Sequence, residues 1–210
     1  FSNIFVTWST SETTDNITVS PTTNTEYWVE ISDGITSCTD SIIINVNSLP
    51  SVEISGLNEI CIGESAQINL TFTGTQPYTV NINGVLENFT NSSENFTITP
   101  INTTTYAIDY ITDVNCKNDT NKNYTLNVNP IPNPIINPSF YTIYPNEEIE
   151  LSTGNYVNYY WYNENNNLLS ENESIIADSS LIVYVIVQDN NGCVGESDNA
   201  VVKYNPRTDL

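Results

Sequence analysis

FTITPINTTTYAIDYITDVNCKNDTNKNYTLNVNPIP, residues 96–132, decides the fold, because its outline occurs twice more in the chain, at residues 17–50 and 174–206. Each copy has a Pro, or another residue in the same position, and a Tyr six residues after it. A Cys follows about ten residues on, and an alternating strand then leads into a Pro-containing linker. The three cysteines, Cys38, Cys116 and Cys193, lie 78 and 77 residues apart. This period has the size of a small domain and predicts an array of domains.

Apolar residues along the chain follow the two-residue period of β-strands. No window carries an uninterrupted apolar stripe at helical spacing, and Val, Ile, Thr and Tyr dominate the apolar segments. In the last strand of each copy, alternate residues are predicted to point inward: Ile42, Ile44 and Val46, then Tyr124, Leu126 and Val128, then Ala200, Val202 and Tyr204. The pattern predicts an all-β fold of antiparallel sheets with one packed and one solvated face.

The middle copy predicts seven short strands, near 51–55, 64–73, 78–83, 85–88, 94–99, 104–112 and 122–129. Asn83-Gly84 is a strong signal for a two-residue hairpin turn. Seven strands in about eighty residues are typical of an immunoglobulin-like sandwich. The predicted domains are 1–48, the C-terminal part of such a domain, then 49–130 and 131–210, each an immunoglobulin-like domain. They are joined by short Pro-rich linkers that act as stiff spacers.

CIGESAQINLTFTGTQPYTVNINGV, residues 61–85, and TPINTTTYAIDYITDVNC, residues 99–116, carry a family resemblance. Together they resemble the immunoglobulin-like and PKD-like repeats of large cell-surface proteins of Bacteroidota associated with gliding. The resemblance implies stalk or adhesin modules at the extracellular cell surface, exported by type IX secretion. The chain departs from the pattern at Tyr144, which stands where a Cys is expected.

The charge balance limits the partners that we expect. The chain has 25 acidic and 4 basic residues and a net charge of −21. Nucleic acids and anionic membranes bind clustered Lys and Arg side chains. Because the chain has so few basic residues, both are poor candidates as partners. No apolar run has membrane-spanning length, and the opening within an apolar run suggests an internal piece of a longer protein. Expected partners are neighbouring repeats of the same chain, and surface glycans or other proteins.

Four cysteines in a chain of this type suggest a disulfide. Cys61 opens the middle repeat and Cys116 precedes its last strand, so we expect a bond between them that ties the two ends of one domain together. The closed loop would contribute about 4 kcal/mol on the chain-entropy model. Cys193 has no partner within its own repeat, and the partner of Cys38 would lie upstream of Phe1. The alternative, in which all four are free buried thiols, stays open.

Catalysis is not expected. The chain has no His, which removes the common general base and the Ser-His and Cys-His pairs. Glu148 and Glu150 are predicted to share a solvent face rather than flank a cleft. No cofactor is predicted, and calcium is the alternative, with oxygens from Asp189–Gly192 and from Glu196–Asp198. Turn chemistry explains the Asn191-Gly192 step equally well.

Aromatic residues give the remaining candidate site. Trp8 and Trp161 lie in corresponding strands, where an immunoglobulin-like sandwich buries a Trp. Tyr160 and Tyr162 point to the opposite face from Trp161 and form a candidate exposed contact for a sugar or a protein. The sequence therefore predicts a non-catalytic stalk or filament segment of a secreted bacterial surface adhesin. Spacer modules of a large secreted hydrolase and a carbohydrate-binding module are the alternatives.

Overall fold

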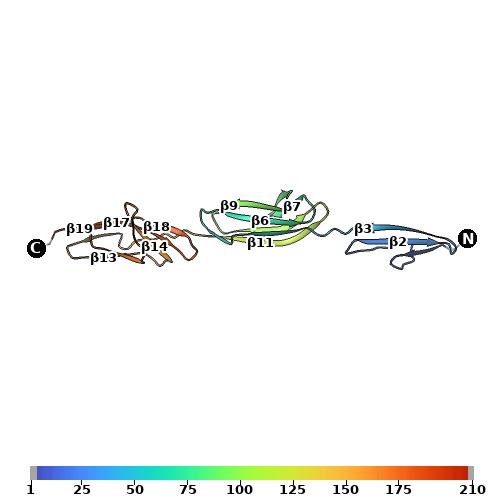
Figure 1. The fold of residues 1–210 in the computed structure, drawn as a ribbon, viewed down its shortest axis with the longest axis horizontal. Helices are drawn as coiled ribbons and strands as arrows, with labels where there is room; N and C mark the ends of the chain where they lie inside the picture. Colours follow the sequence, from blue (N-terminus) through green and yellow to red (C-terminus); the bar gives the residue numbers. More distant parts are fainter. Residues whose placement is uncertain (1–3, 208–210) are drawn as a thin grey trace. The chain divides into compact units, whose positions relative to one another are not determined.

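The computed structural model describes residues 4–207, and within them it consists of strands, turns and loops without a helix (Figure 1). The predicted all-β class is therefore confirmed. Among these residues no helix could cross a membrane. The outermost residues of the predicted first and third domains, 1–3 and 208–210, lie outside the described part.

The first repeat forms one antiparallel sheet in the order β1-β2-β3, with β1 Phe5–Trp8, β2 Thr25–Ser32 and β3 Ser37–Ile44. Tyr27 pairs with Ile42 across β2 and β3. Ile42 was predicted to point inward, yet 65% of its surface is exposed, whereas Tyr124, its counterpart in the middle repeat, is 8% exposed. Among residues 4–48 no second sheet covers this apolar face.

The middle repeat has two sheets, in the orders β4-β6-β9 and β5-β11-β10-β7-β8. The strands are β4 Ser51–Gly56, β5 Glu59–Cys61, β6 Ala66–Thr73, β7 Tyr78–Ile82, β8 Val85–Phe89, β9 Ser93–Ile98, β10 Thr104–Thr112 and β11 Lys117–Asn129. All seven predicted strands are present, six of them within two residues of their expected bounds, whereas β11 begins five residues before the predicted start at 122. The prediction missed β5, which has three residues and pairs in parallel with the end of β11.

Alternation explains the packing of the middle repeat. Ala66, Ile68, Leu70 and Phe72, every second residue of β6, are buried. One core cluster joins β6 to β5 and β11 through Ile60, Tyr124 and Leu126. Asn83 and Gly84 have φ values of 51° and 80°, and the strands on either side of them pair as a hairpin, as predicted.

The third repeat also has two sheets, β13-β16 and the larger β12-β19-β17-β14-β15, with β18 beside β17. The strands are β12 Phe140–Ile143, β13 Ile149–Ser152, β14 Asn158–Asn163, β15 Leu168–Ser170, β16 Ser174–Ala177, β17 Leu181–Gln188, β18 Val194–Glu196 and β19 Ala200–Tyr204. Trp161 is fully buried among Leu151, Val183 and Val185. Its indole Nε1 donates to the Asn172 carbonyl at 2.9 Å, which satisfies the one polar atom of the side chain.

Strand register corrects the alignment of the three copies. Trp8 pairs with Val29 and Trp161 pairs with Val185, so the residue that matches Tyr27 is Val183 and not Tyr184. Cys38 is also displaced: it lies on β3, two residues beyond the turn that precedes the strand, and its thiol is exposed. The Pro-Tyr-Cys pattern thus gives the length of the repeat correctly, but its Tyr and Cys residues do not occupy equivalent structural positions in all three copies.

The chain divides into two compact units. One comprises Phe1–Val52, Phe72–Ser92 and Asp109–Thr120, and the other comprises Glu53–Thr71, Ser93–Ile108 and Asn121–Leu210. This division does not follow the predicted bounds 1–48, 49–130 and 131–210, although every sheet draws its strands from a single repeat. The domain bounds therefore stay a prediction.

Candidate functional site: the disulfide between the second and third repeats

Cys61 lies at the end of the middle repeat from which the chain leaves. It is the last residue of β5 and pairs with Asn129, the last residue of β11, directly before the linker. Buried Ile60 anchors this short strand in the core. The Cys61 N–H donates to Glu64 Oε2 at 2.9 Å, and the Glu64 N–H donates back to the Cys61 carbonyl at 3.0 Å. These two bonds hold the backbone of Cys61 in a defined turn.

Cys193 lies in the turn between β17 and β18 of the third repeat. The Asp189 carboxylate accepts hydrogen bonds from the N–H groups of Asn191 and Cys193, both at 2.9 Å. The Asp189 N–H donates to the Cys193 carbonyl at 3.0 Å and closes the turn. Gly192 has φ = 83°, a left-handed conformation that glycine adopts without strain. The turn therefore presents a buried Cys193 with a fixed backbone.

Cys61 and Cys193 form a disulfide across 132 residues, with their Cα atoms 5.6 Å apart. The predicted bond between Cys61 and Cys116 is wrong, and Cys116 is a free, half-buried thiol. The length of β11 explains the error. Cys61 pairs with the last residue of this 13-residue strand, and Cys116 immediately precedes its first residue. At about 3.3 Å per residue, they lie at opposite ends of a strand roughly 40 Å long, far beyond disulfide reach.

The linker between these repeats is packed against the third repeat. Pro134 and Ile136 are buried, and Ile136 belongs to the core around Trp161. Gly195, on β18 two residues after Cys193, lies directly against the Pro132 carbonyl. The junction between the two repeats therefore contains a disulfide and a close backbone contact between Gly195 and Pro132.

Gly195→Ala should destabilise this junction. A Cβ at Gly195 would overlap the Pro132 oxygen and lie 2.8 Å from the Pro132 carbonyl carbon, so backbone would have to move. We expect a loss of about 1–3 kcal/mol in the free energy of unfolding, measured by chemical denaturation. Gly154→Ala is the matched control, because its Cβ would meet Tyr156 at an ordinary 3.5 Å. Equal midpoints for the two variants would contradict the close contact.

Tyr160 and Tyr162 lie on the outer face of β14, as predicted, and both are half-buried. The Tyr162 ring stacks on Tyr184, with centroids 5.4 Å apart, and the Tyr184 hydroxyl donates to Asn166 Oδ1 at 3.0 Å. Partial burial, followed by the nearby Glu196 carboxylate, raises the pKa of the Tyr184 phenol. Tyr162 is thus part of a stacked pair on the sheet, and its role as a contact site stays a prediction.

Asp189, one of the predicted calcium ligands, has other partners in the structure. The Asp189 carboxylate accepts backbone N–H groups of its own turn. Its counterpart Asp113 does the same, and hydrogen bonds from the N–H groups of Thr75 and Cys116 lower the pKa of that carboxyl. Within residues 4–207, no group of three or more His, Cys, Asp or Glu side chains is placed to hold a metal ion.

Comparison with known proteins supports the fold class. No protein-family model and no curated protein matches the sequence. Among solved structures, the chain is similar to a three-domain fragment of the titin I-band, with a TM-score of 0.51 and 11% identity over 99% of this chain and 89% of that one. A mutated variant of the same three titin domains gives a TM-score of 0.50, with the same identity and coverage. The predicted class of tandem immunoglobulin-like sandwiches is therefore confirmed, and at this identity the likeness concerns the fold alone.

Proposed function

We propose that the chain is a non-catalytic, structural segment of a large secreted bacterial surface protein, a stalk or filament of immunoglobulin-like repeats. The observation that carries the proposal is the disulfide between Cys61 and Cys193, because it joins consecutive repeats instead of stapling one. A protein that only needed stable domains would gain as much from bonds within each domain. A bond between domains resists their separation, which is the requirement of a stalk.

The same bond supports an extracellular location. Structural disulfides form and persist in oxidising compartments, whereas cytosolic thiols are kept reduced. A net charge of −21 spread along the chain favours solubility and disfavours nucleic acids and anionic membranes as partners. The proposed origin in Bacteroidota and the type IX secretion route rest on the resemblance of residues 61–85 and 99–116.

The carbohydrate-binding alternative requires an open aromatic platform. Tyr160 and Tyr162 are half-buried, and one face of Tyr162 is already occupied by Tyr184. A sugar would therefore have to bind the edge or the remaining face of this pair. Nothing in the described part of the structure favours this alternative over the stalk.

Localisation in the source cells tests the proposal. Antibodies raised against the 210-residue chain should label intact, unpermeabilised cells, with immunogold particles on surface projections. Labelling that appears only after permeabilisation would contradict the proposal. Sequencing of the captured parent protein then separates the stalk from the hydrolase spacer, because many further repeats favour the former and an attached catalytic domain favours the latter.

A further inference from the structure

The turn that carries Cys116 has the same construction as the turn that carries Cys193. The Asp113 carboxylate accepts the N–H groups of Asn115 and Cys116 at 2.8 and 2.7 Å, and the Asp113 N–H donates to the Cys116 carbonyl at 2.9 Å. Asp189 makes the corresponding three bonds around Cys193. Cys116 and Cys193 are therefore structurally equivalent, and we call them the turn cysteines.

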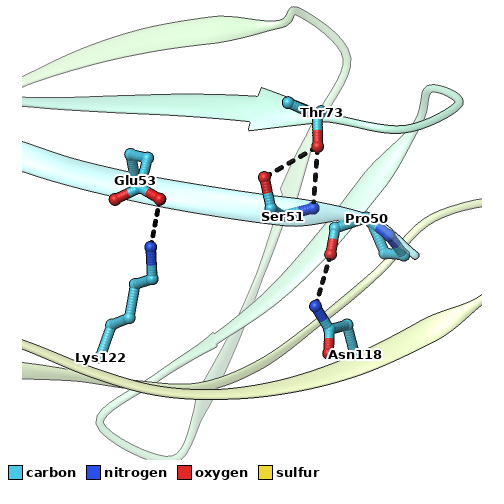
Figure 2. A network of polar contacts seen from close by, with 6 residues as sticks. All are labelled: Pro50, Ser51, Glu53, Thr73, Asn118 and Lys122. Carbon is cyan, nitrogen blue, oxygen red and sulfur yellow. Dashed lines mark hydrogen bonds and ion pairs between the residues drawn. The ribbon is translucent and has the colours of Figure 1, made fainter. Parts of the chain in front are cut away.

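Both turn cysteines lie beside the linker through which the chain enters their repeat. Two residues after Cys193, Gly195 lies against the Pro132 carbonyl. Two residues after Cys116, Asn118 Nδ2 donates to the Pro50 carbonyl at 2.8 Å, as Figure 2 shows. Pro50 is buried and directly precedes β4, whose first residue, Ser51, is held by Thr73 Oγ1 through its N–H at 3.1 Å. The Cys116 thiol thus lies at the end of the middle repeat where a preceding repeat is attached.

The opening cysteine, Cys61, has an equivalent position in the third repeat. Tyr144 exchanges the same backbone and carboxylate bonds with Glu147 that Cys61 exchanges with Glu64, at 3.0 Å each. It also follows a buried Ile143 on a strand paired in parallel with the last strand of the repeat. Tyr144 cannot form a disulfide, so of these two repeats only the middle one has both an opening and a turn cysteine.

We propose that Cys116 is a disulfide site for a preceding repeat of the same type, whose opening cysteine would reach it as Cys61 reaches Cys193. The partner segment is a short strand with a buried apolar residue, a Cys, and a Glu three residues later. The two thiols would be closed by a low-molecular-weight disulfide oxidant: each thiol gives up a proton, the two sulfurs bond, and the oxidant is reduced to two thiols. The first repeat has Thr36 at the turn position and Cys38 on β3. This inference rests on the geometry of the repeats and is independent of the proposed surface function.

The test inserts a second copy of residues 50–131 directly after Ile131 in the full chain. Cys38 and Cys193 are replaced by Ser throughout, together with Cys116 in the first copy and Cys61 in the second. The two remaining cysteines then lie in consecutive copies, as opening and turn cysteine. In oxidised glutathione, the monomeric protein should lose both free thiols, and non-reducing peptide mass spectrometry should find Cys61 joined to Cys116. Two alkylated thiols in the folded monomer would overturn the proposal.

Two further variants make the result decisive. The single-copy chain with Cys38→Ser and Cys193→Ser retains Cys61 and Cys116 in one repeat, and it should keep both thiols free. A second variant keeps the native number of repeats: the five residues Asp189–Cys193 are replaced by the four residues DVNC, the turn of the middle repeat, with Cys38→Ser and Cys116→Ser. Its grafted cysteine should bond Cys61, and a pair of free thiols there would contradict the equivalence of the two turns even if the duplicated chain failed to fold.

Discussion

Pulled from its two ends, the oxidised chain should release about 450 Å less contour length than the reduced chain. The disulfide closes 132 residues into a loop, and an extended residue spans about 3.3–3.6 Å. Force would pass from the middle repeat through Cys61 directly to Cys193, so the residues between them cannot extend even after they unfold. Single-molecule force spectroscopy with and without a reducing agent measures this difference.

The Cys61→Ser/Cys193→Ser variant is the control and should extend fully in both conditions. A bond between Cys61 and Cys116 would instead prevent the extension of 55 residues, or roughly 190 Å of contour length. The length therefore distinguishes the disulfide in the structure from the within-repeat bond that the spacing of cysteines suggested. Full extension of the oxidised wild-type chain would mean that no disulfide closes the loop.

The route by which force passes through the chain matters for a stalk. Repeats joined only by a linker unfold one after another under force, and each event lengthens the chain. A disulfide between repeats instead limits the extension of the residues that it encloses. The proposed site at Cys116 would continue this arrangement toward a preceding repeat, and the load would then pass from one disulfide to the next through the 55 residues between Cys61 and Cys116.

Local patterns were sufficient to predict the strands of the middle repeat. Alternation in β6 and the Asn83-Gly84 turn depend only on neighbouring residues, and both are as expected. β5 was missed because its three residues show no alternation. It forms a strand because the end of β11 offers a parallel partner, which is a tertiary contact that the local sequence does not encode.

The disulfide could not be predicted from cysteine spacing, because spacing does not say at which end of a sandwich each thiol lies. Two local signals were available. Glu64 follows Cys61 by three residues, and an Asp precedes each turn cysteine by three or four, which marks two different kinds of turn. A long strand after Cys116 then separates it from Cys61. The alignment of Tyr184 with Tyr27 was wrong by one residue, because Val183 is the match. Tyr184 lies in an unbroken apolar run, and such a run does not show which alternate residues face the core.

Trp161→Ala should unfold the third repeat or leave it marginally stable. The side chain is fully buried and its indole N–H satisfies the Asn172 carbonyl, so truncation leaves a large cavity and an unpaired acceptor. We expect a loss of about 3–5 kcal/mol in the free energy of unfolding, a large share of what a domain of this size has. Hydrogen exchange at the amides of Val183, Val185 and Val187 reports the stability of this core separately from the other repeats.

Trp8→Ala provides the comparison, because Trp8 occupies the matching strand position but is only half-buried on the uncovered first sheet. Its indole also donates to a backbone carbonyl, that of Thr14 at 2.8 Å, so the two residues differ chiefly in burial. Since the hydrophobic contribution scales with the apolar area removed from water, the exchange rates of β2 should change far less than those of β17. Equal losses in the two repeats would mean that the first sheet is covered in solution, and that its apolar face has a partner that residues 4–48 do not supply.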